Sequence, residues 1–252
     1  MKKSIGDIKK EFAEADRELV MELINNYIED ERKGVQNIIK KARKKEQQYQ
    51  EELKRLEIMR IFENKYPDCN MIAGIDEAGR GPFAGPVVAG AVILPKDCSI
   101  LYIDDSKKLS ASRRDELFEE IKEKAVAYGI GMASPERIDE INILQATYEA
   151  MREAISNMKT EPDIILADAV HIPDIPYRQV GIVHGDAQSI SIAAASVLAK
   201  VTRDRIMEDM DQIYPEYGFS VHKGYGTKMH IEALQKYGPC PIHRTTFIKK
   251  YI

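Results

Sequence analysis

The sequence predicts an α/β domain with a mixed β-sheet flanked by helices, preceded by an N-terminal helical extension. Three observations support this fold class. Residues 1–70 carry apolar side chains at helical spacing and contain no proline before Pro67. From Met71 onward, short apolar runs bounded by glycine, proline or aspartate alternate with longer amphipathic stretches. The first two apolar runs have no helix between them, which predicts a mixed sheet.

The extension, residues 1–70, is expected to form two short helices and then a long one that ends near "YPDCN". Apolar residues at Val35, Ile39 and Ala42 keep the spacing of three to four that a helix requires. The cations of "KKARKK" (40–45) lie mostly off this stripe. They are typical of a solvated helix face, and a phosphate-contacting surface is the alternative. The extension is therefore a candidate substrate-binding arm.

The second part of the chain is expected to open with two strands, a helix and a third strand. The runs "MIAGIDE" (71–77) and "PVVAGAVILP" (86–95) predict two strands joined through a glycine-rich bend. A helix is predicted for 110–125, because Ser110 is a suitable N-cap and the following residues are amphipathic. The run "VAYGIGMAS" (126–134) predicts the third strand.

The remaining elements alternate between helix and strand. One or two helices are predicted for 134–158. The run "DIILAD" (163–168) predicts a buried strand that ends in an acid, and "YRQVGIVHGD" (177–186) repeats that ending. A long helix is predicted for 189–214 and a shorter one for 226–238. This order is that of a single α/β domain.

The composition is that of an ordinary globular protein. Of the 252 residues, 44% are hydrophobic and 31% are charged, and the net charge is −4. The acidic balance argues mildly against a nucleic-acid binder, although bound divalent metals would offset clustered acids locally. The longest uncharged stretch, 81–95, is too short and too rich in glycine to span a bilayer. The N-terminus also lacks the apolar core of a signal peptide.

The cysteines favour a reducing compartment. Cys69, Cys98 and Cys240 are widely spaced and form no CxxC pair, which argues against a disulfide framework or a zinc site. We therefore expect a cytoplasmic protein without membrane contact.

Acidic residues stand at the ends of three predicted strands. Asp76 and Glu77 end the first run, Asp168 ends "DIILAD", and Asp186 ends "YRQVGIVHGD". Ligands gather at strand ends in open α/β sheets, so these acids can converge in space. Burying an unpaired carboxylate is costly, and a divalent cation with oxygen ligands would compensate for that cost.

A purely structural interpretation stays open for each acid taken alone. Each could start a turn or cap a helix, and Asp186 is a reasonable N-cap for the helix that follows. Neighbours on an ideal strand point to opposite faces, so Asp76 and Glu77 share one site only where the chain twists or bends. Ala78-Gly79 makes such a bend feasible.

The chemistry of these residues points to a magnesium or manganese site. Several acids without a histidine or cysteine ligand cluster suit these ions, and such sites serve phosphoryl or phosphodiester transfer. Two ions about 4 Å apart would orient a water and stabilise the leaving oxygen. No GxSxG or Cys–His signature supports nucleophilic catalysis. An unrelated magnesium phosphotransferase would carry a GxxxxGK[ST] loop, and the sequence has none.

Six ordered blocks from Met71 to the C-terminus resemble type 2 ribonuclease H, the bacterial ribonuclease HII family. They are "GIDEAGRGPFAGPVVAGAVIL", "DDSKKLS", "ILAD", "GDAQSISIAAASVLAKVTRD", "YGFSVHKGYGTKMHIEALQKYG" and "HRTTF". The resemblance implies a ribonuclease H-like sheet and a two-metal hydrolase, using Mn²⁺ or Mg²⁺, for the RNA strand of RNA–DNA hybrids. It also implies incision 5′ of single ribonucleotides in duplex DNA. We expect a 3′-hydroxyl and a 5′-phosphate as products, and roles in ribonucleotide excision and DNA replication.

By this resemblance, the four metal-binding and catalytic acids of the family fall on Asp76, Glu77, Asp168 and Asp186. The family usually has glycine after the third acid, whereas this chain has Ala169. That departure leaves the carboxylate in place and puts only the local turn in question.

The resemblance also assigns substrate contacts. Gly79, Arg80 and Gly81 match the GRG segment with which the family reads the ribose 2′-hydroxyl, largely through backbone groups. Glycine lets main chain approach a sugar closely, and the 2′-hydroxyl distinguishes RNA from DNA. Tyr225, set between two glycines, resembles the tyrosine that stacks on the deoxyribose just 3′ of the ribonucleotide. A tight turn and a packed core tyrosine are the structural alternatives.

Three cations resemble phosphate-side contacts, although each could equally be a helix-surface charge: Lys107, Lys200 and Arg203. Asp204 is expected to pair with a nearby base. The five histidines have no metal-binding spacing, and we assign them no chemistry.

Two rival functions remain from the sequence. Ribonuclease HIII typically carries a sheet-containing N-terminal platform and lacks the GRG tripeptide, whereas residues 1–70 are predicted to be helical. A non-cleaving hybrid-binding module would have lost one of the four acids. We expect a monomeric enzyme with a catalytic domain over 71–252, ending in C-terminal helices. Its expected partners are RNA–DNA hybrids and duplex DNA with embedded ribonucleotides.

Overall fold

The computed structural model describes residues 3–252, and the chain consists of two compact units, Met1–Glu57 and Ile58–Ile252. The division falls within helix α3 (Lys33–Met59), earlier than the predicted boundary at residue 70. The reason is that the segment after α3 packs on the second unit. Glu63 accepts hydrogen bonds from Ser189 Oγ at 2.6 Å and from the Ser191 N–H at 3.1 Å.

The first unit is helical, as predicted. It contains α1 (Ile5–Glu14), α2 (Arg17–Tyr27) and most of α3. Ser4 and Asp7 form a capping box at the start of α1, and Asp16 caps α2. Apolar side chains from the three helices form a small core of its own, which includes Ile8, Ile24, Val35 and Ile39.

The elements of the second unit follow the predicted order, with two short helices added. A third short helix, Ile61–Asn64, lies where the long N-terminal helix was expected to continue. The strands are β1 (Ile72–Ala78), β2 (Val87–Ile93), β3 (Ala127–Ala133), β4 (Ile164–Asp168) and β5 (Arg178–Ile182). The predicted helices are α5 (Ala111–Lys124), α6 (Pro135–Asn157), α7 (Ile190–Ile213) and α9 (Lys228–Tyr237). The short helices are α4 (Ile61–Asn64), α8 (Phe219–His222) and α10 (Thr245–Ile248), and η1 (Gly185–Ala187) is a 3₁₀ turn. Helix α6 joins two helical segments across a break at Asn142.

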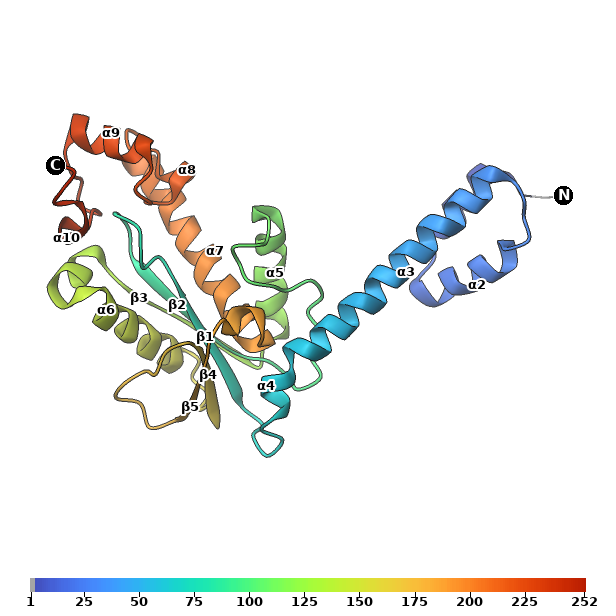
Figure 1. Ribbon diagram of the computed structural model, residues 1–252, viewed down its shortest axis with the longest axis horizontal. Coiled ribbons are helices and arrows are strands. Elements are labelled where there is room, and N and C mark those ends of the chain that lie inside the picture. The colour runs from blue at the N-terminus through green and yellow to red at the C-terminus, as the bar shows by residue number, and fades with distance from the viewer. Residues whose placement is uncertain (1–2) are drawn as a thin grey trace. The chain divides into compact units, whose positions relative to one another are not determined.

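The five strands form one mixed sheet, which confirms the predicted fold class. Their order is β3-β2-β1-β4-β5. The pairs β1–β2 and β2–β3 are antiparallel, whereas β1–β4 and β4–β5 are parallel. Helix α6 covers one face and α7 covers the other (Figure 1).

Helix α7 lies unusually close to the centre of the sheet. A β-carbon on Gly74 of β1 would lie 2.0 Å from the carbonyl carbon of Ser191. One on Gly90 of β2 would lie 2.5 Å from the carbonyl oxygen of Ala195. Only glycine fits at these two positions, and the helix therefore brings its side chains directly onto the residues that follow Gly74. Within residues 3–252, none of the helices combines the length and the apolar character needed to cross a membrane.

Candidate active site

Asp76 and Asp168 are neighbours at the carboxyl edge of the sheet. β1 and β4 are parallel, and the register Ile75↔Ala167 puts each acid at the following position of its strand. Side chains alternate between the faces of a strand, and Gly74, two residues before Asp76, faces α7. Both acids therefore share the α7 face of the sheet.

Asp76 is 5% exposed and is held from α7. Ser196 hydrogen-bonds to its carboxylate. Because the Ser196 hydroxyl donates to that carboxylate, Ser106 is the donor between the two serine hydroxyls, which lie 2.9 Å apart. Burial raises the pKa of Asp76 well above its usual value, and the charges of Glu77 and Asp168 raise it further. The folded chain alone accommodates this charge poorly.

Glu77 lies at the same edge, one position after Asp76 on β1. β1 stays paired with β2 through Ala78, so the Glu77 side chain starts from the opposite face of the strand. Its charge nevertheless raises the pKa of Asp76, and the charges of Asp168 and Lys107 act on its own pKa, so its carboxylate reaches the same group of acids. One carboxylate oxygen lies 3.2 Å from Nη1 of Arg80, and the other, Oε2, is buried without a hydrogen-bond partner among the described residues. Burial raises the pKa of Glu77, and Asp168 adds to that rise against the opposing effect of Arg80.

Asp186 reaches this edge from the 3₁₀ turn η1, four positions after β5 has ended at Ile182. The N-cap interpretation of this acid is wrong, because Ser189 caps α7. The N–H of Gly185 donates to Asp168 Oδ1 at 2.8 Å, which ties the turn to the third acid. Burial raises the pKa of Asp186, and nearby carboxylates raise it further.

Lys107 stands against this group of acids and is 75% exposed. Its Nζ lies 3.7 Å from Asp186 Oδ2 and 3.8 Å from Asp105 Oδ1. Burial lowers the pKa of Lys107, but the charges of Asp105, Asp76 and Asp186 outweigh burial and raise it overall. Asp105 is a fifth acid at this edge that we did not predict, although it stands in the block "DDSKKLS".

The donor set fits a hard divalent cation. All the acidic ligands offer oxygen, the carboxylates are buried against one another, and Glu77 Oε2 has no donor among the described residues. No three Asp, Glu, His or Cys side chains in the described part of the chain are already grouped as metal ligands. Ion binding would therefore have to draw the carboxylates closer together.

The GRG segment and Tyr225 lie side by side. A β-carbon on Gly81 would be 3.9 Å from Cε1 of Tyr225. The tyrosine is 47% exposed, so it is not a packed core residue. The N–H of Phe83 donates to the carbonyl of Gly224 at 2.8 Å, which joins the two loops by their backbones. A glycine-rich strip and an exposed aromatic ring thus form one surface.

Arg244, which we did not predict, holds the GRG segment from behind. It is fully buried and donates to the carbonyls of Gly79 at 2.6 Å and Arg80 at 2.9 Å. It also donates to the carbonyl of Gly85 at 2.8 Å and 3.0 Å. The signal in the sequence is the block "HRTTF", which contributes to the family resemblance but indicates no role for its arginine.

Arg203 does not reach the surface, so we revise its expected phosphate contact. It is 1% exposed, and its guanidinium donates to the carbonyls of Pro86, Lys223 and Ala84 at 2.9–3.0 Å. A guanidinium with three backbone acceptors is a structural clamp. Sequence alone could not tell an inward from an outward arginine here.

Lys200 is largely engaged within the protein. Its Nζ lies 2.7 Å from Asp204 Oδ1, and the side chain is 20% exposed. The expected pairing of Asp204 with a nearby basic side chain is therefore confirmed. Burial lowers the pKa of Lys200. Of the three predicted phosphate contacts, only Lys107 is freely exposed beside the acids.

The residue after Asp168 gives a first prediction. Ala169 is exposed and has φ 52°, the left-handed conformation that favours glycine. Ala169→Gly should therefore raise the free energy of unfolding by about 0.5–1 kcal/mol, as urea denaturation would measure. Ala167→Gly is the matched control, because Ala167 is buried in the extended strand β4 and should lose stability. Destabilisation by both substitutions would contradict this account.

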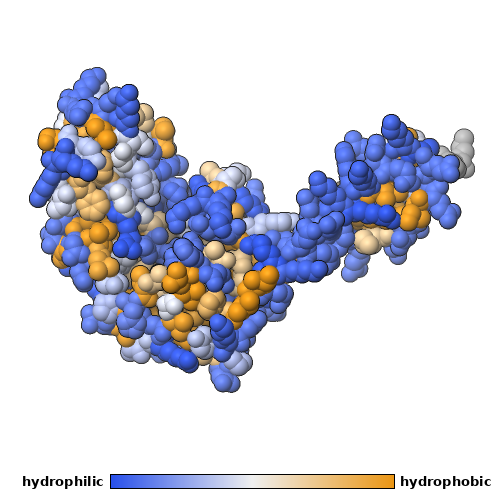
Figure 2. Space-filling model, viewed as in Figure 1, coloured by the Kyte–Doolittle hydropathy of each residue, from blue (hydrophilic) through white to orange (hydrophobic). Residues whose placement is uncertain are grey.

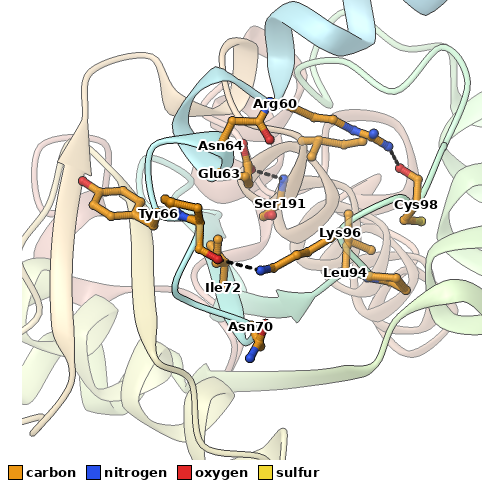
Figure 3. Close-up of a pocket in the computed structure, with 13 residues that line it drawn as sticks. Arg60, Glu63, Asn64, Tyr66, Asn70, Ile72, Leu94, Lys96, Cys98 and Ser191 are labelled. Atoms are coloured by element: carbon orange, nitrogen blue, oxygen red, sulfur yellow. Dashed lines mark hydrogen bonds between the residues drawn. The ribbon is translucent and has the colours of Figure 1, made fainter.

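A separate cavity of about 240 Å³ lies near the start of β1 (Figure 3). None of the predicted site residues lines it. Lys96 donates to the carbonyl of Pro67 at 2.9 Å, and Arg60 donates to that of Cys98. The cavity does not form part of the candidate active site.

Two family models match the chain. The model described as Ribonuclease HII matches residues 73–250, and the one described as Ribonuclease HII N-terminal domain matches residues 4–67. Ribonuclease HII of Clostridioides difficile (strain 630) is 54% identical over 252 residues, which cover 99% of each chain. A helical N-terminal domain of this type disfavours the ribonuclease HIII alternative.

Solved structures share the fold. The structure of the PCNA:RNase HII complex from Archaeoglobus fulgidus is 31% identical, with a TM-score of 0.59, over 71% of this chain and 95% of that chain. Bst-RNase HIII in complex with Mn²⁺ has a TM-score of 0.53 and 16% identity, over 67% and 63% of the two chains. At that identity it shows the fold alone. The ribonuclease H-like sheet is confirmed.

Proposed function

Because the chain belongs to the ribonuclease HII family, it is a nuclease with ribonuclease H activity on RNA–DNA hybrids, and we propose that it also incises duplex DNA 5′ of single ribonucleotides. The observation that carries this proposal is the neighbourhood of two features. Asp76, Asp168 and Asp186 meet at one edge of the sheet. Gly81 follows Asp76 by a few residues on the same chain segment, and Tyr225 lies beside Gly81.

The chain's own residues would hold two divalent ions through Asp76, Glu77, Asp168 and Asp186. Bound Mn²⁺ or Mg²⁺ would supply an activated water and stabilise the charge that develops on phosphorus oxygens and the leaving group. Ser196 fixes the carboxylate of Asp76, so this ligand is already oriented.

Two exposed cations are suited to a scissile phosphate. Arg80, whose side chain is 43% exposed, neutralises Glu77, and Lys107 stands beside Asp186. Both are placed to exchange a carboxylate for a phosphate oxygen when a nucleic acid approaches. We propose that water attacks phosphorus on the 5′ side of the ribonucleotide and leaves a 3′-hydroxyl and a 5′-phosphate.

Recognition of the ribonucleotide would depend on the surface formed by the GRG segment and Tyr225. Gly81 is exposed, and a β-carbon added there would have no neighbour closer than 3.9 Å, so its backbone is open to a sugar. A site that hydrogen-bonds a hydroxyl can reject a substrate without it by about 10⁴–10⁵. The exposed ring of Tyr225 would then stack on the next deoxyribose, which selects an RNA-to-DNA junction.

The test is a labelled DNA duplex with one ribonucleotide, incubated with the protein and Mn²⁺ or Mg²⁺, followed by mapping of the nick. A single cut 5′ of the ribonucleotide is expected, with no cut in the all-DNA duplex or in the presence of chelator. Cleavage of hybrids with no cut at single ribonucleotides would refute the proposed incision at single ribonucleotides. Binding without any metal-dependent cut would favour a non-cleaving module.

For the first unit we propose a duplex-binding role that rests on the exposed cations of α3. Lys40, Lys41, Arg43, Lys44 and Lys45 are all exposed, and none of them forms an ion pair with the residues that the structure describes. Figure 2 shows hydrophilic residues over most of the visible surface of this unit. Such a face suits the phosphates of nucleic acid.

Replacing these five cations by glutamine together should weaken binding to duplex substrates. The slope of log Kd against log salt should fall by about 0.9 for each phosphate that the variant no longer neutralises, because fewer counterions are released. The mapped cut site should not move. Lys9→Gln with Lys10→Gln is the control, since these cations are exposed on α1 of the same unit. If the variant with all five cations replaced kept the same slope of log Kd against log salt, the proposed duplex-binding role would be refuted.

A further inference from the structure

Three of the five histidines lie together in the core beside Tyr225. His222, His230 and His243 are 8%, 0% and 4% exposed. The rings of His222 and His230 stack with centroids 4.5 Å apart, and the Nε2 atoms of His230 and His243 are 2.9 Å apart. The metal-site chemistry does not use them, and their spacing in the sequence indicates no role.

The direction of the hydrogen bonds follows from one backbone donor. The N–H of Cys240 points at Nδ1 of His243 from 2.9 Å, so that nitrogen must accept and carries no proton. The carbonyl of Cys240 already accepts from the backbone N–H of His243 at 3.0 Å. Burial raises the pKa of the Cys240 thiol to about 11, so the S–H stays a donor 3.1 Å from the same Nδ1. The neutral His243 ring therefore carries its proton on Nε2.

The chain of hydrogen bonds continues from His243 to the reading surface, which is the surface of the GRG segment and Tyr225. Nε2–H of His243 donates to Nε2 of His230, which fixes the proton of His230 on Nδ1. That Nδ1–H donates to the carbonyl of Tyr225 at 2.9 Å. The tautomer of His222 is fixed separately. The N–H of Gly224 donates to its Nδ1 at 3.1 Å, so its Nε2 carries the proton and donates to the carbonyl of Tyr217.

Two adjacent residues, His243 and Arg244, thus connect to the two parts of the reading surface, Tyr225 and the GRG segment. His243 reaches Tyr225 through His230, and Arg244 holds the carbonyls of Gly79 and Arg80. We propose that His243 and His230 are positioning residues, which set Tyr225 against the GRG segment through an ordered hydrogen-bond chain. This inference rests on the proposed incision at single ribonucleotides.

The chain works only with both rings neutral. A second proton on His230 would set two Nε2–H donors against each other, and a second proton on His243 would set its Nδ1–H against the N–H of Cys240. Burial keeps both rings neutral at physiological pH, since it lowers the pKa of His230 and of His243 to about 4.

A matched pair of substitutions at His230 separates positioning from packing. His230→Asn places an amide N–H where Nδ1–H stood, so it can still donate to the carbonyl of Tyr225, but it loses the hydrogen bond from His243. His230→Gln places its amide where Nε2 stood, so it keeps the hydrogen bond from His243 but loses the one to the carbonyl of Tyr225. Each variant gives up one hydrogen bond, so a merely structural role predicts similar unfolding midpoints and similar kinetics for both.

The proposal predicts different kinetics. His230→Gln should raise KM for the duplex with one ribonucleotide about five- to tenfold and change kcat less than about twofold, because the stacking ring is misplaced in binding. His230→Asn should stay within about twofold of the parent chain in both constants. His171→Asn is the control, because His171 is exposed and outside the cluster.

A second measurement uses the unsubstituted chain, so it does not depend on variants that fold. Long-range ¹H–¹⁵N NMR spectra should show His230 protonated on Nδ1 and His243 on Nε2. The opposite tautomers, or equal KM values for the Gln and Asn variants, would overturn the positioning role. Failure of the parent chain to cut at ribonucleotides would instead refute the proposed function and leave the tautomer result standing.

Discussion

Asp76→Asn is expected to lower kcat on a ribonucleotide-containing duplex by at least about 10³-fold, because asparagine is a neutral and weaker ligand for a divalent ion. Asp76 sits at the centre of the acidic edge, and its carboxylate is the one that Ser196 orients. Steady-state cleavage at saturating Mn²⁺ or Mg²⁺ measures this effect. Binding of the substrate should change far less, since the surface of Gly81 and Tyr225 and the exposed Lys107 stay in place.

The same substitution should make the metal-free protein more stable. Burial and the like charges of Glu77 and Asp168 raise the pKa of Asp76, so ionising this side chain costs the folded state free energy that the solvated carboxylate of the unfolded chain does not lose. Removing it should raise the free energy of unfolding by about 1–3 kcal/mol.

The pH dependence has a definite sign. For an acid with a raised pKa in the folded state, the stabilising contribution is complete below the unfolded pKa and is lost as pH rises through the folded pKa. With chelator present, the stability of the parent chain should therefore fall with rising pH above about 4 more steeply than that of Asp76→Asn.

Glu123→Gln is the control for this experiment, because Glu123 is exposed on α5 and should leave cleavage and stability unchanged. Added Mn²⁺ or Mg²⁺ should raise the melting temperature of the parent chain and of this control more than that of Asp76→Asn. Full cleavage activity in Asp76→Asn would show that this carboxylate does not bind the catalytic ions.

Gly79→Ala is expected to destabilise the protein by about 2–4 kcal/mol and to lower kcat/KM at ribonucleotides at least about 100-fold. Gly79 has φ 91°, and a β-carbon there would lie 2.0 Å from Nε of Arg203 and 2.8 Å from the carbonyl oxygen of Pro86. Arg203 cannot yield without breaking its three bonds to backbone carbonyls. The whole GRG segment must shift instead.

Gly81→Ala is the matched comparison, two residues along the same loop. The nearest atom to an added β-carbon is Cε1 of Tyr225 at 3.9 Å, an ordinary contact. Stability should therefore change by less than about 0.5 kcal/mol. The methyl group would nevertheless stand where the ribose must approach, so kcat/KM at single ribonucleotides should fall about 10- to 100-fold. Urea denaturation and cleavage assays on both variants would check these effects, and similar stability losses would contradict them.

The strands and long helices could be predicted because their apolar periodicity is local. The first two strands, the capped helix after Ser110 and the long helix α7 all appear near the predicted bounds. The short helices α8 and α10 could not, since four residues offer no period to detect.

The candidate site was predictable only in part. The positions of the acids followed from the strand ends, but the source of Asp186 did not, because a 3₁₀ turn and a strand end look alike in sequence. Whether an arginine points inward depends on which carbonyls a distant loop presents to it. Two of the three acceptors of Arg203, and all the acceptors of Arg244, lie more than a hundred residues away, and no local pattern encodes that.

The bonds from Arg244 to Gly79 and Arg80 join residues that are 165 and 164 positions apart. They tie the C-terminal segment around the short helix α10 to the glycine-rich loop, and terminal segments of this kind open more readily than the centre of a sheet. The acidic edge depends mainly on adjacent strands and one helix, which can assemble without these bonds. A partly opened molecule would thus keep its capacity for hydrolysis while losing its discrimination between sugars, and fidelity would be the more fragile of the two properties.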